Sequence, residues 1–379
     1  MSSLSVEKSE GFADFMRSAN HWLGKKIFNT DSVSAYFEPI VQLVSPMWSA
    51  GECTAKVLDI YTESKDIFTL RLTVSNRWGG FVPGQFVGIT VNKNGTRLTR
   101  YFSVSSAPAL WRANGIVEFT IRRQASGVVT NWIPEHLYAG SQVSISPAMG
   151  EFTYRQKNEP ALFIAGGSGI TPFRSILQDL SDTGSVADVH LLYYCDGPTH
   201  LFKTEWTRIQ MRCPGIKVTF IDALAQGRFG TAHLFEFVPD FHLRDIYICG
   251  PGPMISAVRE TLKKERIDDE RVFFEFFGAA PMMADSLVEA VPDSVAKVVF
   301  QQSGKIVTTV DKPATLLEMA ESAGLSPVTG CRMGVCHQCI CQKSSGRVLN
   351  TLTGKTSDNG AGEVQLCVSV PVSDVTLAL

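Results

Sequence analysis

Hydrophobic and polar positions follow one periodicity between residues 51 and 155 and another between residues 156 and 277. The first stretch contains short β-branched or alternating segments separated by turn residues such as Pro83-Gly84 and Asn94-Gly95. This pattern is typical of antiparallel strands. Segments at this spacing predict a small antiparallel barrel. They read CTAKVLDIYTE, IFTLRLTV, QFVGITV, RYFSVSS, IVEFTIRR and SQVSISPAM.

In the second stretch, strands alternate with helical segments. The predicted strands are ALFIAGG, VHLLYYC, IKVTFID, DIYICG and RVFFEFF, and the clearest helices are PFRSILQDL and MISAVRETLKKERI. Such alternation predicts a parallel sheet with helices on its faces. The segment 278–294 that follows is rich in Ala, Pro and Ser and is predicted to be an interdomain linker.

Two further parts complete the expected domain organisation. Residues 295–379 begin with a hairpin and a helix, continue through a cysteine-rich loop and end with the strand VTLAL, which predicts a third domain. Residues 1–50 are an irregular N-terminal extension in which apolar residues recur at helical spacing from 11 to 28. This predicts an amphipathic helix, which either packs on the rest of the protein or contacts a membrane surface or a partner.

Composition narrows the class of protein. The 379 residues include 35 Lys and Arg and 37 Asp and Glu, so the net charge of −2 offers no basic excess for binding nucleic acid. No apolar run reaches the ~18 residues of a transmembrane helix. The first residues, MSSLSVEKSE, lack the pattern of a secretion signal. We therefore expect a soluble cytoplasmic protein.

Cysteine spacing gives the strongest chemical signal. A C-x4-C-x2-C loop followed by a distant cysteine is the plant-type [2Fe–2S] pattern, in which four thiolates hold two irons. A zinc site is the less favoured alternative, because zinc loops prefer C-x2-C pairs. Cys341 lies outside the spacing, and His337 is interpreted as a neighbour of the cluster rather than a Rieske-type ligand. The four predicted ligands are Cys331, Cys336, Cys339 and Cys367.

Two motifs of the first domain predict a flavin site. One strand supplies an arginine for a phosphate, aromatic rings to stack on the isoalloxazine and a hydroxyl to meet its reactive nitrogen. These residues are Arg100, Tyr101, Phe102 and Ser103. A glycine turn before the predicted helix NWIPEHL suits a pyrophosphate and favours FAD over a flavin with one phosphate. This turn comprises Gly127, Val128, Val129 and Thr130.

Two loops of the second domain predict a site for a nicotinamide coenzyme. Both follow a buried strand and precede a helix, so both are expected at the carboxyl edge where parallel sheets bind ligands. Neither has the GxGxxG spacing of a Rossmann fingerprint. The first loop contains Gly166, Gly167, Ser168, Gly169 and Thr171. The second contains Cys249, Gly250, Pro251 and Met254.

These motifs, in this order, resemble those of the ferredoxin-NADP⁺ reductase superfamily, and the chain from about 51 to 379 is similar to single-chain flavin and iron–sulfur reductases that serve bacterial oxygenases. The resemblance implies an FAD-binding barrel at 51–155, a NAD(P)-binding domain at 156–277 and a β-grasp ferredoxin domain at 295–379. It also implies that Glu275 lies near the flavin and acts with Ser103 and Cys249 in catalysis. Phe102 replaces the commoner tyrosine, and Thr130 replaces serine.

The expected function is electron transfer from NAD(P)H through FAD and a [2Fe–2S] cluster to an acceptor protein. GCRMGVCHQC, SGRVLNTLTG and VQLCVSVP are similar to a subgroup that partners membrane-bound di-iron acyl desaturases and carries an N-terminal extension, so a desaturase is the favoured acceptor. A Rieske or di-iron hydroxylase is the alternative, and a redox sensor or carrier without turnover is a third reading. The choice of coenzyme stays open, because Asp196 suits a ribose hydroxyl while His200, Lys203 and Arg228 could bind a phosphate.

Overall fold

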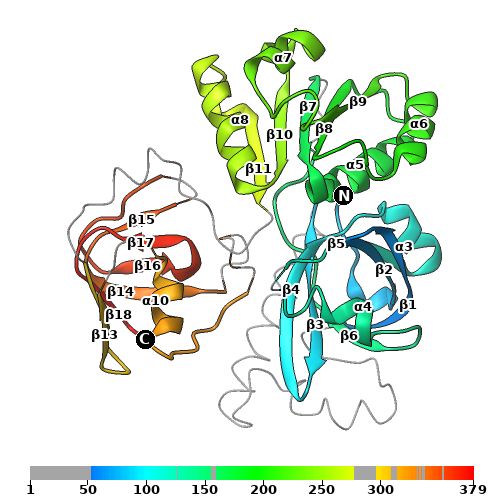
Figure 1. The fold of residues 1–379 in the computed structure, drawn as a ribbon. Coiled ribbons are helices and arrows are strands. Elements are labelled where there is room, and N and C mark those ends of the chain that lie inside the picture. The colour runs from blue at the N-terminus through cyan, green and yellow to red at the C-terminus, as the bar shows by residue number, and fades with distance from the viewer. Residues whose placement is uncertain are drawn as a thin grey trace, which may run out of the picture.

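The computed structural model describes residues 53–125, 127–154, 159–276, 296–308, 314–330, 332, 334, 338–351 and 354–379. Within these ranges it contains three larger sheets, one for each predicted domain (Figure 1). The predicted helix at 11–28, the rest of the N-terminal extension and the predicted linker at 278–294 lie outside the described residues.

The first sheet is antiparallel, with strand order β4-β3-β6-β1-β2-β5. Asn94 and Gly95 both have positive φ, 51° and 81°, as a two-residue hairpin between β3 and β4 requires. The outer strands approach each other where Ser105, after β4, donates its backbone N–H to Glu118 O on β5. The elements are β1 (Cys53–Ser64), β2 (Ile67–Val74), β3 (Phe86–Lys93), β4 (Thr96–Ser103), α3 (Pro108–Asn114), β5 (Ile116–Arg122), α4 (Trp132–His136) and β6 (Gln142–Ile145).

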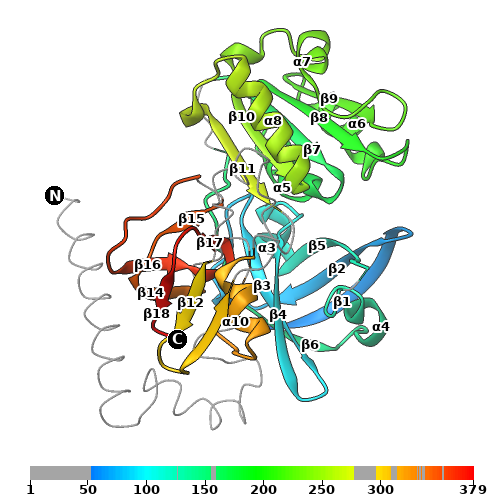
Figure 2. The same cartoon turned by 60° about the vertical axis from the view of Figure 1, so that its left-hand side comes forward.

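The second sheet is parallel, with strand order β11-β10-β7-β8-β9. Helices α5 and α6 pack on one face and α7 and α8 on the other, and α8 lies over the sheet in Figure 2. The strand order reverses between β7 and β10: β8 and β9 are added on one side of β7, and β10 and β11 on the other. Such sheets bind ligands at this switch point. The elements are β7 (Ala161–Gly166), α5 (Ile170–Asp182), β8 (Val189–Cys195), α6 (Lys203–Arg212), β9 (Ile216–Asp222), α7 (Thr231–Phe237), β10 (Asp245–Gly250), α8 (Gly252–Lys264) and β11 (Val272–Phe276).

The third sheet is mixed, with strand order β13-β12-β18-β14-β16, and a short β15-β17 pair lies beside it. Helix α10 begins with a capping box between Thr315 and Glu318 and buries its apolar face in this domain's core. The elements are β12 (Lys297–Phe300), β13 (Lys305–Thr308), α10 (Leu316–Ser322), β14 (Ile340–Ser345), β15 (Val348–Asn350), β16 (Gly362–Gln365), β17 (Ser369–Pro371) and β18 (Val375–Leu377).

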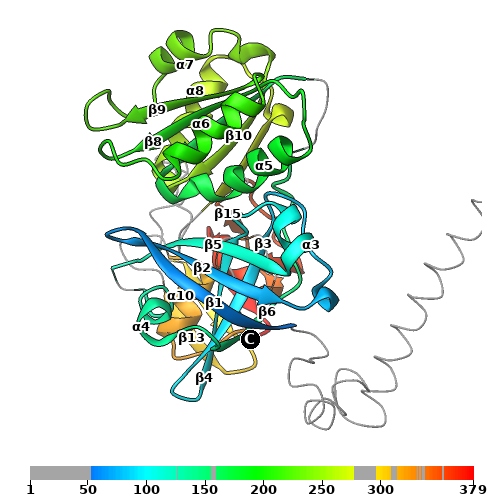
Figure 3. The same cartoon turned by 90° about the vertical axis from the view of Figure 1, so that its right-hand side faces the viewer.

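The predicted fold class is therefore confirmed: an antiparallel sheet, a parallel sheet with helices on both faces, and a C-terminal ferredoxin-like domain. Figure 3 shows the parallel sheet lying above the antiparallel one, with α5 on the side of the parallel-sheet domain that faces β5. Among the helices of the described residues, none has both the length and the apolar character that a bilayer crossing demands.

One charged side chain is buried in the C-terminal domain. The Lys343 side chain is 1% exposed, and its ammonium donates to the carbonyl oxygens of Gly346 at 2.7 Å and Asp358 at 3.0 Å, and also to Gly360 O. Three backbone carbonyls from the chain between β14 and β16 therefore share one cation, which fixes this long connection to the sheet.

We expect Lys343→Met to lower the free energy of unfolding of the C-terminal domain by about 2–4 kcal/mol, because the substitution leaves buried carbonyls without a donor. Thermal loss of the cluster's visible absorbance should shift to lower temperature, while loss of flavin should not. Lys297→Met, at an exposed lysine of the same sheet, is the matched control. Equal melting curves for both variants would contradict this role.

Candidate functional site

Three predicted catalytic residues meet where the parallel sheet faces the antiparallel one. Ser103 is the last residue of β4, and its hydroxyl donates to Glu275 Oε2 on β11 at 3.4 Å. Glu275 in turn pairs in register with Cys249 on β10. All three side chains are buried. The structure thus brings together one residue from the first domain and two from the second.

Burial controls the charge of the cysteine in this group. Burial, and then the neighbouring Glu275 carboxylate, raise the pKa of the Cys249 thiol well above its ordinary value. The thiol is therefore neutral at physiological pH and can only pack or donate a weak hydrogen bond, because nucleophilic attack needs a thiolate.

The predicted flavin strand offers a guanidinium that suits a phosphate. Arg100 on β4 donates to Thr99 O at 2.8 Å, and no carboxylate of the described residues forms an ion pair with it. Phe102 lies on the same side of the strand by the alternation of β residues. Tyr101 points the other way and packs edge-on against Phe86, with 5.7 Å between ring centroids.

The second flavin motif forms a tight turn before α4. A Cβ atom built on Gly127 would lie 2.1 Å from Thr130 Oγ1, and that oxygen already accepts a hydrogen bond from the Gln124 N–H at 3.2 Å. Val129 is buried and anchors the turn, whereas Val128 is 48% exposed. The turn thus brings backbone close to α4 without a side chain in the way, which fits a pyrophosphate.

The two nicotinamide loops pack directly against each other at the edge of the parallel sheet. A Cβ atom on Gly166 would lie 2.4 Å from Met254 Sδ and 2.9 Å from Pro251 Cδ, and one on Gly169 would lie 2.2 Å from Cys249 O. The loops leave no room for side chains at these glycines, so a coenzyme can approach the backbone closely. In the same turn, Thr171 donates to Ser168 O at 3.1 Å. Gly167 has a φ of 54°, and Gly250 lies beside Gly166.

Arg122, which the sequence analysis did not single out, also reaches this edge. Its guanidinium Nη2, from the end of β5, lies 3.2 Å from the position that a Cβ atom of Gly167 would occupy. Tyr193 fixes the same glycine by donating to its carbonyl at 3.2 Å. A positive charge from the first domain therefore lies over the glycine loop of the second. The sequence feature that could have indicated this residue is the pair of consecutive arginines, Arg122 and Arg123, at the end of the predicted strand IVEFTIRR.

The suggestion that His200 binds a coenzyme phosphate is wrong. His200 is buried, and its Nε2 lies 3.1 Å from the carbonyl oxygens of both Tyr193 and Ile221, so the ring is used inside the sheet domain. Lys203 donates to Pro198 O at 2.7 Å. Asp196 and Arg228 are exposed.

Two of the four predicted cluster ligands lie within the described residues, and they are close together. Cys339, before β14, and Cys367, after β16, are buried with their Sγ atoms 3.2 Å apart. Two sulfurs at this separation fit neighbouring ligands of a metal centre. Cys341 instead lies on β14, with its Sγ near Ala378 O. Cys331, Cys336 and His337 lie outside the described residues.

Two contacts hold the described part of the cysteine loop to this domain. Gln365 donates to Gly334 O at 3.0 Å, and Arg332 Nη1 donates to Glu321 Oε2 on α10 at 3.1 Å. Arg332 adopts a φ of 58°, which is unusual for a residue with a side chain. The loop is thus fixed to both β16 and α10.

Comparison with known protein families assigns each domain. Residues 54–154 match the oxidoreductase FAD-binding domain, residues 163–260 the oxidoreductase NAD-binding domain, and residues 299–372 the 2Fe-2S iron-sulfur cluster binding domain. FAD, NAD(P)H and a [2Fe–2S] cluster are therefore the cofactors of this chain, as predicted, and the residues described above fit all three.

Similar proteins share this three-domain arrangement. The stachydrine N-demethylase reductase subunit Stc4 of Rhizobium meliloti is 30% identical, over 78% of this chain and 87% of its own length. A glycine betaine monooxygenase reductase subunit of Chromohalobacter salexigens is 27% identical, over 90% of this chain and 98% of its own. The structure of phthalate dioxygenase reductase has the same fold, with a TM-score of 0.57 and 22% identity over 87% of this chain and 98% of that one.

We expect Gly127→Ala to weaken FAD binding at least about tenfold, because the added methyl group must displace Thr130 and open the turn. The measurement is the FAD-to-protein ratio after gel filtration, followed by titration of the apoprotein with FAD. Gly230→Ala adds a methyl group that meets no heavy atom within 4 Å and should bind FAD like the wild type. Equal FAD content in both variants would exclude a role for this turn.

Ser103→Ala should slow flavin reduction by saturating NAD(P)H by about tenfold or more, because it removes a buried hydroxyl donor from the contact with Glu275. Anaerobic stopped-flow absorbance measures this rate directly. Ser64→Ala, at the far end of β1, is the control. An unchanged rate in Ser103→Ala would remove Ser103 from the site.

Proposed function

Because this chain belongs to the single-chain reductases that combine FAD, NAD(P)H and plant-type [2Fe–2S] domains, we propose that it is the reductase component of an oxygenase system. The observation that carries the proposal is the contact between Ser103 and Glu275. It brings the flavin-binding strand and the nicotinamide-binding edge to one buried point. A [2Fe–2S] domain in the same chain provides the exit for the electrons.

When bound, FAD accepts the two electrons of a hydride and releases them one at a time to the [2Fe–2S] cluster. Ser103 would offer a hydroxyl donor, and Glu275 a buried acceptor, to the bound cofactors from their contact at the domain boundary. Arg100 and the turn from Gly127 to Thr130 would hold the flavin phosphates. The loops at Gly166 and Cys249 would hold the coenzyme. Because these groups are buried between two domains, water is kept from the reacting atoms.

The acceptor proposed first is an oxygenase, because the relatives with the same three domains include a reductase subunit of a monooxygenase. The membrane-bound acyl desaturase remains the second candidate. It is supported by the likeness of GCRMGVCHQC and the N-terminal extension to the desaturase-linked subgroup. Both acceptors take electrons singly, so the three domains serve either one. A redox sensor without turnover is disfavoured, because such a protein needs no hydride donor, whereas this chain has two loops that suit a nicotinamide coenzyme at the sheet edge.

The direct test is an anaerobic titration with NADPH, and with NADH in parallel, followed by visible absorbance and low-temperature EPR. Flavin bleaching together with the EPR signal of a reduced cluster is the expected result, and the better donor identifies the coenzyme. Bleaching without a cluster signal would overturn the order of electron transfer. Reconstitution with a purified oxygenase or a purified desaturase in vesicles then distinguishes the acceptors.

We expect Cys336→Ser to keep flavin reduction and to lose both the cluster's EPR signal and electron transfer to a protein acceptor, because a [2Fe–2S] cluster needs all four ligands. Cys341→Ser should retain both, since Cys341 lies on β14 with its Sγ directed to Ala378 O and falls outside the spacing of the predicted ligands. Transfer at the wild-type rate in Cys336→Ser would refute the ligand assignment.

A further inference from the structure

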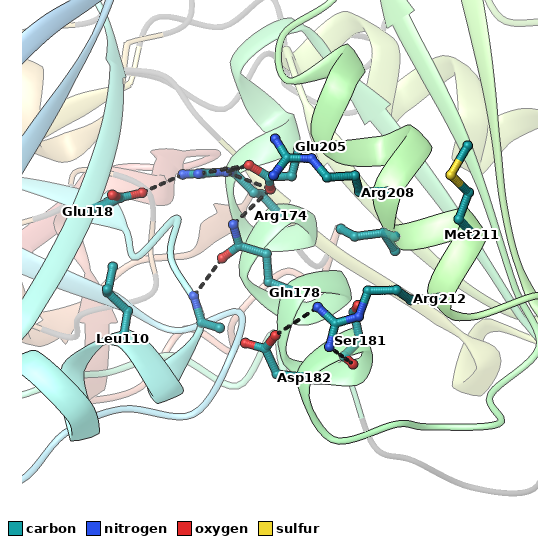
Figure 4. Close-up of a pocket in the computed structure, with 12 residues that line it drawn as sticks. Leu110, Glu118, Arg174, Gln178, Ser181, Asp182, Glu205, Arg208, Met211 and Arg212 are labelled. Carbon is teal, nitrogen blue, oxygen red and sulfur yellow. Dashed lines mark hydrogen bonds and ion pairs between the residues drawn. The ribbon is translucent and has the colours of Figure 1, made fainter.

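One buried guanidinium joins the antiparallel and parallel sheet domains. Arg174 on α5 donates from Nη1 to Glu118 Oε2 on β5 at 2.9 Å, and from Nε and Nη2 to the Glu205 carboxylate on α6 at 3.0 Å each. The Arg174 and Glu118 side chains are only 8% and 10% exposed. Figure 4 shows the Arg174 guanidinium between the carboxylates of Glu118 and Glu205.

The chemistry of this group requires arginine. Burial alone would lower the pKa of Arg174, but Glu205 and then Glu118 outweigh burial and raise the pKa above its ordinary value. The guanidinium also lies 4.2 Å from the ring centroid of Phe202. A planar fork of donors can bind two carboxylates and face a ring at once, which a lysine ammonium cannot do.

Two uncharged contacts on the same face of α5 extend the junction. Ser175 donates to Ser106 O at 2.7 Å, and Gln178 Oε1 accepts from the Ala107 N–H at 2.8 Å. Gln178 also donates to Glu205 Oε1 at 2.8 Å, which links these contacts to the carboxylate that Arg174 holds. Arg174, Glu118, Glu205 and Gln178 therefore form one connected network across the domain boundary, and Ser175 adds a separate contact beside it.

This network lies between the two halves of the site. Helix α5 begins at Ile170, directly after the glycine loop of the nicotinamide site. Ser106 and Ala107 follow closely after Ser103, which ends the flavin-binding strand. Any movement of α5 against this segment therefore moves the glycine loop relative to Ser103. A cavity of about 520 Å³ lies beside this network and is lined by Glu118, Arg174 and Glu205.

We infer that Arg174 is a positioning residue for hydride transfer, because by holding Glu118 it fixes the distance and angle between the coenzyme loops and the flavin-binding strand. The inference rests on the proposed function. Arg174 lies at the domain junction and not among the residues assigned to the coenzyme, so cutting its contact changes the rate of transfer and not the affinity. A misplacement of about 1 Å between reacting groups can cost about 100-fold in rate.

The decisive variant is Glu118→Gln in the full-length, FAD-loaded protein, because it removes the charge that Arg174 holds across the boundary and keeps the shape of the side chain. Glu118 Oε1 also lies 3.2 Å from Arg71 Nε on β2, so Arg71→Gln, which cuts contacts only within the first domain, is measured beside it and should keep the wild-type rate. Stopped-flow flavin reduction over a series of coenzyme concentrations separates the limiting rate from the dissociation constant. We expect the limiting rate to fall about 10- to 100-fold and the dissociation constant to change less than about twofold. The kinetic isotope effect with C4-deuterated coenzyme should persist, which ties the loss to hydride transfer.

Two further proteins sharpen the test. Arg174→Gln removes the contacts with both Glu118 and Glu205, so it should be at least as slow as Glu118→Gln. The double variant should be no slower than Arg174→Gln, because either single substitution already cuts the contact across the boundary. Arg112→Gln is the matched control. Arg112 also faces α5 across the boundary, 3.9 Å from Asp179, but its side chain is 61% exposed. In the Arg112→Gln variant, flavin should be reduced at the wild-type rate, because an exposed ion pair contributes little to holding two domains in one arrangement.

The outcomes separate the two proposals. If the wild type is reduced and Glu118→Gln has the same limiting rate, the ion pair is only a stabilising contact and the inference is overturned, even if the melting temperature falls. A weaker coenzyme affinity at an unchanged limiting rate overturns it too. A wild type that neither NADPH nor NADH reduces overturns the proposed function itself, and the positioning role with it. If Arg174→Gln does not fold, Glu118→Gln alone decides.

Discussion

The contact between the end of an antiparallel strand and the edge of a parallel sheet is the constraint on which the rest of this structure depends. Ser103 and Glu275 belong to different sheets and are 172 positions apart, yet they meet at 3.4 Å inside the protein. Each domain alone offers only half of a site. Flavin and nicotinamide rings have to meet face to face, so the accuracy of the domain contact becomes part of the chemistry. The buried network around Arg174 links the same two domains through Glu118 on β5 and the segment after β4.

Glycine has a second purpose at this edge. Gly166 and Gly169 allow the backbone to approach a coenzyme, but they also let the loop after β7 press against Pro251, Met254 and the Cys249 carbonyl. A methyl group at either position would push the two loops apart before any ligand arrived. The two motifs therefore act as one unit, although about 80 residues separate them in the chain.

The longer strands and the set of cluster ligands could be predicted from the sequence, because the alternation of apolar residues and the spacing of the cysteines are local patterns. It did not predict α3, in which Pro108 alone is buried, or the strands β14 to β17, which have only three to six residues. Charged pairs such as Arg174 and Glu118 are 56 positions apart and leave no local pattern. The role of His200 could not be predicted for the same reason. The sequence around a histidine is the same whether its ring faces solvent or contacts two buried carbonyl oxygens.

The electrostatics of Arg100 connect the third domain to the first. Burial, and then the positive charge of Arg332 in the cysteine loop, lower the pKa of Arg100, while Glu321 acts in the opposite direction. Two arginines from different domains therefore repel each other beside the predicted flavin phosphate site. The pyrophosphate of bound FAD, with one negative charge on each phosphate, would offset this repulsion by placing negative charge against Arg100. Among the described residues, Arg332 is thus a charge of the third domain that acts on the predicted flavin phosphate site of the first.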